Sequence, residues 1–166
     1  MNKLLHQETA EALNELLTLT FQENSFADNC AYNLSVMFMM VQAEEIFHEH
    51  YAHVFPKWAD KISHCLISLG GFPHRGALTI NDEVYGDLVD MFEEIQNKLM
   101  DYRNKIYEVI EIAELHNDRE VVSFLDELLK ELLPYVRQTF IWTTKANKFG
   151  QDLEGFDEDF EDFTNI

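Results

Sequence analysis

The sequence predicts an all-α protein, a four-helix bundle with a long crossover between its second and third helices. The chain has 166 residues, of which 46% are hydrophobic, six are Gly and three are Pro. Helix interiors exclude Gly and Pro, so their scarcity favours long helices. Apolar residues recur at helical spacing along four segments, and one connection is much longer than the others.

The first pair of helices is expected within residues 4–40 and 43–69. The stretch NSFADNC in the first helix is less regular, and we expect a bend or a break there. The second helix should end at GGFP, because Gly at a C-cap and a following Pro both stop helices. Pro56 lies inside this helix and should kink it or split it in two.

The second pair follows the crossover PHRGALTINDEVYG, in which we expect a short helix near Asp82. A third helix is predicted over residues 85–116 and a fourth over residues 119–148. Asp118 is placed to cap the fourth helix, and Pro134 should kink it. Residues 1–150 are therefore predicted to form one helical bundle.

Residues 151–166 have a different composition. The stretch DLEGFDEDFEDF holds seven carboxylates and no basic residue. Such a composition favours a disordered acidic tail, which is our prediction for this segment. Phe156, Phe160 and Phe163 interrupt the acidic run and could dock on another surface.

The charge of the chain restricts its partners. The formal net charge is −19, and such a surface repels phosphate and attracts cations, so we do not expect DNA binding. Cys30 and Cys65 have no CxxC spacing and imply no disulfide framework, which favours a reducing cytoplasm. We see neither a signal peptide nor a membrane-spanning run, and therefore expect a cytoplasmic protein.

One face of the second helix carries candidate metal ligands. On a continuous helix with about 100° per residue, the titratable side chains within about 60° of Asp60 are Glu45, Glu49, His53 and His64. Carboxylate and imidazole groups suit iron, zinc or manganese. Asp60 and His64, four residues apart, can bind one ion, but a partner surface must complete the site. A solvated polar face without an ion has the same composition.

Two stretches resemble the Dps proteins, the miniferritins of the ferritin-like superfamily. ADKISHCLISLGGFP resembles the end of their helix B, where Asp-x-x-x-Glu precedes Leu-Gly-Gly, and AELHNDREVVSFLDELLKELLPYVRQTFIW resembles their fourth helix. The similarity extends over about residues 10–148. It implies a ferritin-like four-helix bundle, a homo-oligomeric shell of twelve subunits, and ferroxidase activity with peroxide followed by storage of the ferric mineral.

The resemblance also implies a metal site between two subunits. Aligned on the Leu-Gly-Gly anchor, Asp60 and His64 take the positions of the Asp and Glu from one subunit, and Glu49 that of the acid from the other. The two family histidines correspond to Glu45 and Asn33. The implied ligands for ferrous or ferric iron, with zinc or manganese as alternatives, are Glu45, Glu49, Asp60 and His64.

Two alternatives stay open at this point. Asn33 is a poor iron ligand and Leu34 replaces the usual Trp, so the chain could be a non-catalytic assembly or scaffold protein with a degenerate metal site. Glu45-x-x-His48 is also the pattern of a di-metal site inside one ferritin-type bundle. That site needs matching acids on facing helices, where the fourth helix offers Asp126, Glu127 and Glu131.

Overall fold

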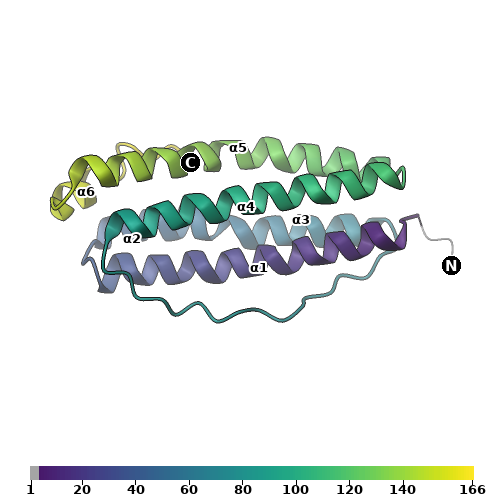
Figure 1. Cartoon of the computed structure of the whole chain (residues 1–166), viewed down its shortest axis with the longest axis horizontal. Coiled ribbons are helices and arrows are strands. Elements are labelled where there is room, and N and C mark those ends of the chain that lie inside the picture. Colours follow the sequence, from purple (N-terminus) through teal and green to yellow (C-terminus); the bar gives the residue numbers. More distant parts are fainter. Residues whose placement is uncertain (1–3) are drawn as a thin grey trace.

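The computed structural model describes residues 4–166, which form helices and no strand. The elements are α1 (Gln7–Val36), α2 (Val41–Phe47), the π-helical turn η1 (His48–Ala52), α3 (Val54–Ser68), α4 (Leu88–Leu115), α5 (Arg119–Phe149) and α6 (Leu153–Asp159). Figure 1 shows four long rods side by side, made by α1, by α2 with η1 and α3, by α4 and by α5. The predicted all-α bundle with a crossover between its second and third rods is confirmed.

α1 continues through NSFADNC, where we expected a bend or a break. Asn24 and Asn29 do not compete for the backbone of their own helix, because their amides donate to Ala52 O and Glu83 O of neighbouring segments. Buried Phe26 and Cys30 keep the apolar face of α1 continuous through this stretch. The first rod instead ends after Val36, and the turn contains Met39 at a φ of 54°.

The second rod is interrupted just before Pro56. The π-helical turn η1 separates α2 from α3. Pro56 is the third residue of α3, so its missing N–H removes no hydrogen bond within α3 itself. The missing N–H leaves the Ala52 carbonyl without its helical donor, and the Asn24 amide donates to it at 3.1 Å. The split expected from Pro56 is therefore present, with α1 supplying the lost hydrogen bond.

The crossover, residues 69–87, runs in extended form along the outside of α1 (Figure 1). Gln22 of α1 donates from Nε2 to Thr79 O at 3.0 Å and accepts the Thr79 N–H at 2.7 Å. The α1 side chains that bond the crossover backbone in this way are Asn14, Thr18, Gln22, Asn29 and Asn33. The short helix expected near Asp82 does not form, because these bonds hold the backbone extended.

The core is rich in aromatic rings. Trp142 of α5 lies with its ring centroid 5.3 Å from that of Phe47 and 5.9 Å from that of Phe92. Farther along the bundle, Trp58 stacks on Tyr102 at 6.1 Å, and both side chains are buried. Buried aromatic side chains contribute the largest apolar areas to a core, and here the rings join the second rod, α4 and α5.

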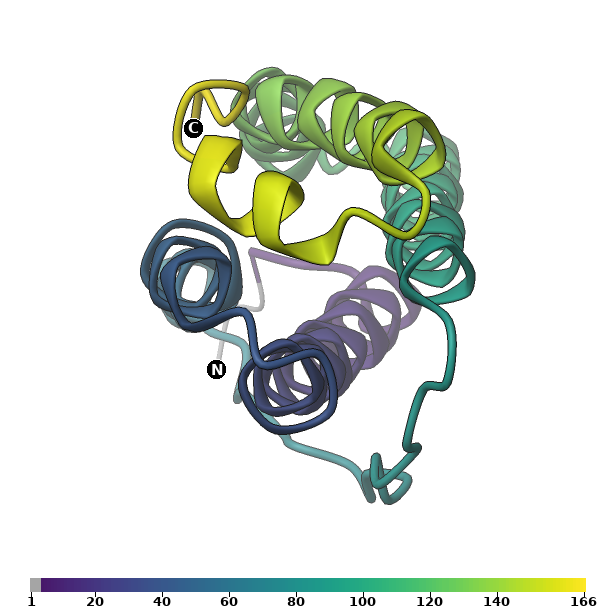
Figure 2. The ribbon, with the colours of Figure 1, turned by 90° about the vertical axis from the view of Figure 1, so that its left-hand side faces the viewer.

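The C-terminal segment is ordered, which corrects the prediction of a disordered tail. Figure 2 shows α6 lying across the end of the bundle, where Phe156 and Phe160 are fully buried and Phe163 nearly so. Phe156 lies in α6, Phe160 is its C-cap and Phe163 follows in the next turn, and the three rings contact one another with centroids 5.3–5.6 Å apart. Their burial against the bundle outweighs the mutual repulsion of the carboxylates, which mostly stay at the surface.

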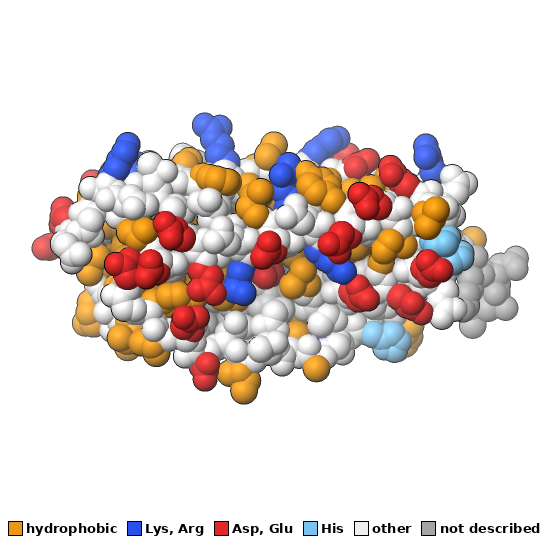
Figure 3. Space-filling view, viewed as in Figure 1, with side chains coloured by type: hydrophobic (Ala, Val, Ile, Leu, Met, Phe, Trp, Pro, Cys, Tyr) orange, Lys and Arg blue, Asp and Glu red, His pale blue; other side chains and the backbone are white. Residues whose placement is uncertain are grey.

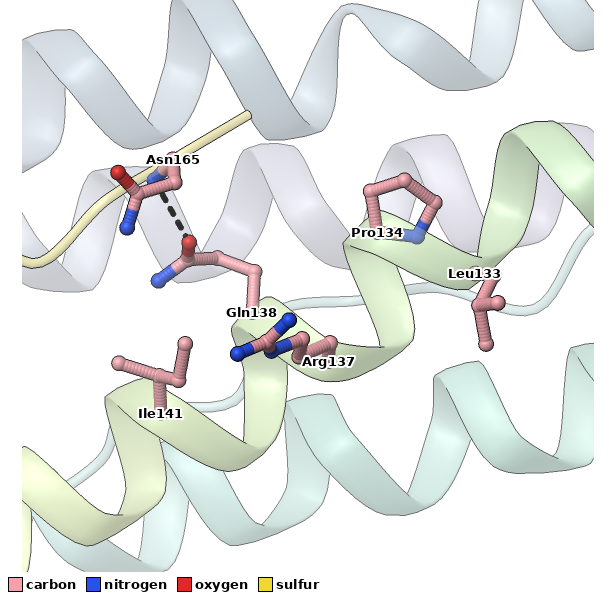
Figure 4. Close-up of a pocket in the computed structure, with 6 residues that line it drawn as sticks. All are labelled: Leu133, Pro134, Arg137, Gln138, Ile141 and Asn165. Atoms are coloured by element: carbon pink, nitrogen blue, oxygen red, sulfur yellow. Dashed lines mark hydrogen bonds between the residues drawn. The ribbon is translucent and has the colours of Figure 1, made fainter.

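Specific polar contacts fix this segment in place. Asp157 accepts the backbone N–H of Ala43, in the first turn of α2, at 2.7 Å. Gln138 of α5 donates to Phe163 O and accepts the Asn165 N–H at 2.7 Å, as Figure 4 shows. Residues 151–166 therefore belong to the folded bundle rather than to a tail outside it.

Candidate metal-binding site

The structure places the four predicted ligands on the second rod. Glu45 belongs to α2, Glu49 to η1, and Asp60 and His64 to α3, and all four are exposed. The opposite face of the same rod is buried and carries Phe47, Tyr51, Phe55, Trp58, Ile62 and Leu66. The carboxylate-imidazole face, defined by the four ligands, thus points away from the bundle's own core.

The four side chains do not form a closed ligand set within one chain. Among residues 4–166, His6, Glu8 and His116 form a group of potential ligands whose ligand atoms all lie within 4.8 Å of one another. None of the four predicted ligands belongs to this group. A site that uses all four predicted ligands therefore needs a second surface.

Asp60 and His64 border an open hollow of about 450 Å³ on α3. Within the described chain, neither side chain has a hydrogen bond or an ion pair. Lys61 Nζ forms an ion pair with Glu131 Oε1 at 2.6 Å. Burial raises the pKa of the Cys65 thiol, which also lines the hollow, to about 11. The thiol stays protonated near neutral pH, which leaves Asp60 and His64 as the available ligands of this hollow.

Around the π-helical turn, Glu49 belongs to a chain of polar contacts. Its Oε2 lies 3.3 Å from His53 Nδ1, and the His53 ring centroid lies 4.3 Å from that of His48. His48 Nε2 in turn lies 3.4 Å from Asp28 Oδ1 on α1. Glu49 therefore has two imidazoles close by, from a different pair of histidines than those of the family site.

The pairing of His48 with His53 cannot be predicted from α-helical spacing, for a geometric reason. His48 and His53 are five residues apart, and on an α-helix they would point about 140° away from each other. In the π-helical turn the His53 N–H bonds to His48 O at 3.1 Å, so the two side chains come together. π-helical turns are frequent at functional sites, and a histidine pair at this spacing is the signal that the sequence offers.

Asn33, where the resemblance places a histidine, has a structural role. It is buried, donates from Nδ2 to Glu83 O at 2.9 Å, and accepts the Tyr85 N–H at 2.8 Å. All of its amide is thus engaged with the crossover and with its own helix. Leu34, where the family has Trp, is fully buried in the core.

The alternative site inside one bundle is wrong for this chain. Glu45 is exposed, and Asp126, Glu127 and Glu131 lie on the exposed face of α5. Two carboxyl groups of the described chain are buried. Glu23 lies between the rods, and Asp118 lies at the α4–α5 turn. Burial raises the pKa of Glu23 to about 8, with nearby Asp101 adding to the rise and Lys98 opposing it. One neutral acid is not a di-metal ligand set.

The charge distribution agrees with cation binding away from α5. Figure 3 shows acidic side chains across the visible face and basic ones gathered along the edge that α5 forms. A hollow on α5 beside Pro134, drawn in Figure 4, is lined by Arg137 and by no carboxylate. That hollow does not suit a metal cation.

The order of the four rods and the long crossover between the second and third define a ferritin-type bundle. The sequence matches the Ferritin family, described as a Ferritin-like domain, over residues 10–136, and the chain belongs to this family. Comparison with curated proteins gives no match. The matched region contains all four predicted ligands but neither His6 nor α6. No helix in residues 4–166 is both long and apolar enough to cross a membrane.

Proposed function

We propose that this protein is a Dps-like iron-binding protein that takes ferrous iron as its substrate at a site between two subunits. Asp60 and His64 come from one subunit, and Glu45 and Glu49 come from its partner. The observation that carries the proposal is that all four side chains of the second rod are exposed, while the interior of the described bundle has no comparable ligand set. The net charge of −19 favours the approach of a cation.

The donor chemistry fits ferrous iron. Three carboxylates and one imidazole are ligands that divalent iron accepts. His53 offers a second imidazole in place of Asn33, because its Nδ1 lies 3.3 Å from Glu49 Oε2. Two donors at that separation can contact one ion with bonds of about 2.1 Å. The proposed site therefore has both acid and imidazole donors from the second rod alone.

Oxidation at this site requires an electron acceptor, which the resemblance identifies as peroxide. Two ferrous ions each give up one electron, the O–O bond of one hydrogen peroxide breaks, and two protons complete two waters. The carboxylates favour the ferric product over the ferrous substrate, because Coulomb attraction grows with the charge of the ion. Glu45, Glu49 and Asp60 thus assist the loss of the electron.

The test is an anaerobic ferrous titration followed by peroxide. We expect saturable ferrous binding and oxidation faster than in buffer, with both lost in Asp60→Ala. Asp126→Ala is the matched control, because Asp126 is an exposed carboxylate on α5. An absence of saturable binding in the wild-type protein, or equal losses in the two variants, would refute the proposal.

A second candidate is a non-catalytic assembly protein on the same bundle. The observation that favours it is the exposure of large apolar side chains on the crossover, where Phe72 is 74% and Ile80 is 82% exposed. Contiguous exposed apolar surface marks contact sites between proteins. Light scattering that gives an assembled mass, together with no ferrous binding and no metal in the purified protein, would select this candidate.

A further inference from the structure

The end of the bundle opposite α6 brings together His6, Glu8 and His116. His6 caps α1, Glu8 lies in its first turn, and His116 follows α4, so the tertiary fold joins groups that are 108 residues apart. Figure 1 shows this end with the start of α1 close to the turn between α4 and α5, and Figure 3 shows histidine side chains beside carboxylates there. The group lies at the end of the bundle opposite α6 and includes none of the four residues of the carboxylate-imidazole face.

The contacts within the group are short. His116 Nε2 lies 3.0 Å from Glu8 Oε2, and the His6 and His116 rings stack with their centroids 3.5 Å apart and their planes 5° from parallel. One ligand atom from each of the three residues lies within 4.8 Å of the other two. His116 lowers the pKa of the Glu8 carboxyl, first through this hydrogen bond and then through its charge. Glu8 is thus a carboxylate already directed at imidazole nitrogen.

A further carboxylate lies behind the pair of rings. Asp118 is 8% exposed, and its Oδ1 accepts a hydrogen bond from the backbone N–H of His6 at 3.4 Å. Its Oδ2 is buried and has no hydrogen-bond partner within the described chain. A buried oxygen without a donor is costly, and a cation nearby offsets that cost electrostatically. The two carboxylates therefore make this end attractive to a positive ion.

Two imidazoles and one carboxylate form a ligand set that zinc accepts, with a water in the fourth position. Bonds of about 2.1 Å in a tetrahedron separate the donors by about 3.4 Å. His116 Nε2 and Glu8 Oε2 already lie within that separation at 3.0 Å, so the His6 nitrogen must approach them, by at most about 1.4 Å. His6 and Glu8 are exposed and free to move. An ion lies in the plane of each imidazole that binds it, and the planes of two stacked rings do not meet. The His6 ring must therefore turn out of the stack, which breaks the hydrogen bond that its Nδ1 accepts from Glu8 N.

We propose that His6, Glu8 and His116 bind one divalent transition-metal ion of the zinc type, separate from the proposed iron site. The ion joins the first turn of α1 to the turn between α4 and α5. By joining these two segments, the ion stabilises this end of the bundle. The resulting site leaves one coordination position to water.

Zinc titration of the untagged full chain by calorimetry, with Co²⁺ absorption as a second probe, tests the proposal. We expect one zinc ion per chain at His6, Glu8 and His116, in addition to any zinc that the proposed iron site takes, and an increase in melting temperature with zinc. In His116→Ala and Glu8→Gln the affinity should fall at least about tenfold and the zinc-dependent stabilisation should disappear. His74→Ala, which removes an exposed histidine from the crossover, should change neither property.

The variants separate this site from the iron site. Glu8→Gln keeps the stacked rings, so it decides the outcome even where His116→Ala does not fold. Zinc affinity that is unchanged in Glu8→Gln, or is lost in Asp60→Ala instead, would overturn the proposal. The zinc ion that is lost in Glu8→Gln should remain in Asp60→Ala, whether or not Asp60 binds iron or zinc, so failure of one proposal is distinguishable from failure of the other.

Discussion

Glu23 places a single carboxyl group between the rods of the bundle. Ferritin-type bundles with an internal di-metal site use several such acids on facing helices, and here the neighbouring positions carry Tyr51, Tyr102 and Lys98. The aromatic side chains fill the space that an ion and its ligands would need. Glu23 is therefore neutral near pH 7 and affects stability rather than metal binding.

The raised pKa of Glu23 makes stability depend on pH. Its pKa is about 8 in the folded chain against a model-compound value of 4.5. Between these values the folded state binds more protons than the unfolded state, so the free energy of unfolding falls as pH rises, by up to about 1.4 kcal/mol per pH unit. Glu23→Gln should remove this fall and melt at a higher temperature than wild type at pH 8.

Thermal melts from pH 5 to pH 8 measure this effect. Glu111→Gln, which neutralises an exposed acid on α4, is the control and should follow the wild-type curve. Parallel pH curves for wild type and Glu23→Gln would show that the folded-state pKa of Glu23 is not raised.

Residue spacing predicted part of the candidate site. It placed Glu45, Glu49, His53 and His64 on the same side of the helix as Asp60. The family resemblance then gave the set Glu45, Glu49, Asp60 and His64, and all four side chains are exposed. Spacing could not find the contact of His48 with His53, because that contact exists only with π-helical geometry. Spacing also gives no signal for the contact between Glu8 and His116, because the two residues are 108 positions apart.

At the scale of elements, α6 shows how a few apolar side chains override an acidic composition. Net charge predicted a disordered tail, whereas the spacing of the three Phe residues was the signal for a docked helix. The long helices were predicted well because their apolar periodicity is sustained over many turns. The crossover was harder, because polar side chains of α1 and not its own sequence keep it extended.

Asp157→Ala should weaken the contact between α6 and α2. The variant loses the hydrogen bond to Ala43 N and a negative charge at the positive end of a helix, which together contribute about 1–2 kcal/mol. We expect the melting temperature to fall by about 2–6 °C in this chain. Asp159→Ala, on the exposed side of α6, is the matched control and should change it little. Equal effects of the two substitutions would contradict the capping role.

At the scale of the whole molecule, the bundle displays its candidate ligands and much of its exposed apolar surface on the outside. Exposed apolar side chains on the crossover include Phe72, Ile80 and Val84. A single chain has half of each proposed iron site, since Asp60 with His64 and Glu45 with Glu49 lie on separate stretches of one rod. Sequence periodicity describes one chain, so completion by a second chain comes from the family resemblance and not from spacing.

Subunit complementation tests this central claim most directly. Asp60→Ala/His64→Ala and Glu45→Ala/Glu49→Ala each remove one half of the proposed site, and neither should bind ferrous iron alone. In mixed assemblies made by co-expression, a site that combines the intact halves of two chains returns, at about a quarter of the wild-type number for random pairing across a two-fold contact. Restored ferrous binding at that level is the result we predict. Mixed assemblies, verified by native mass spectrometry, that bind no more iron than either parent would contradict the account.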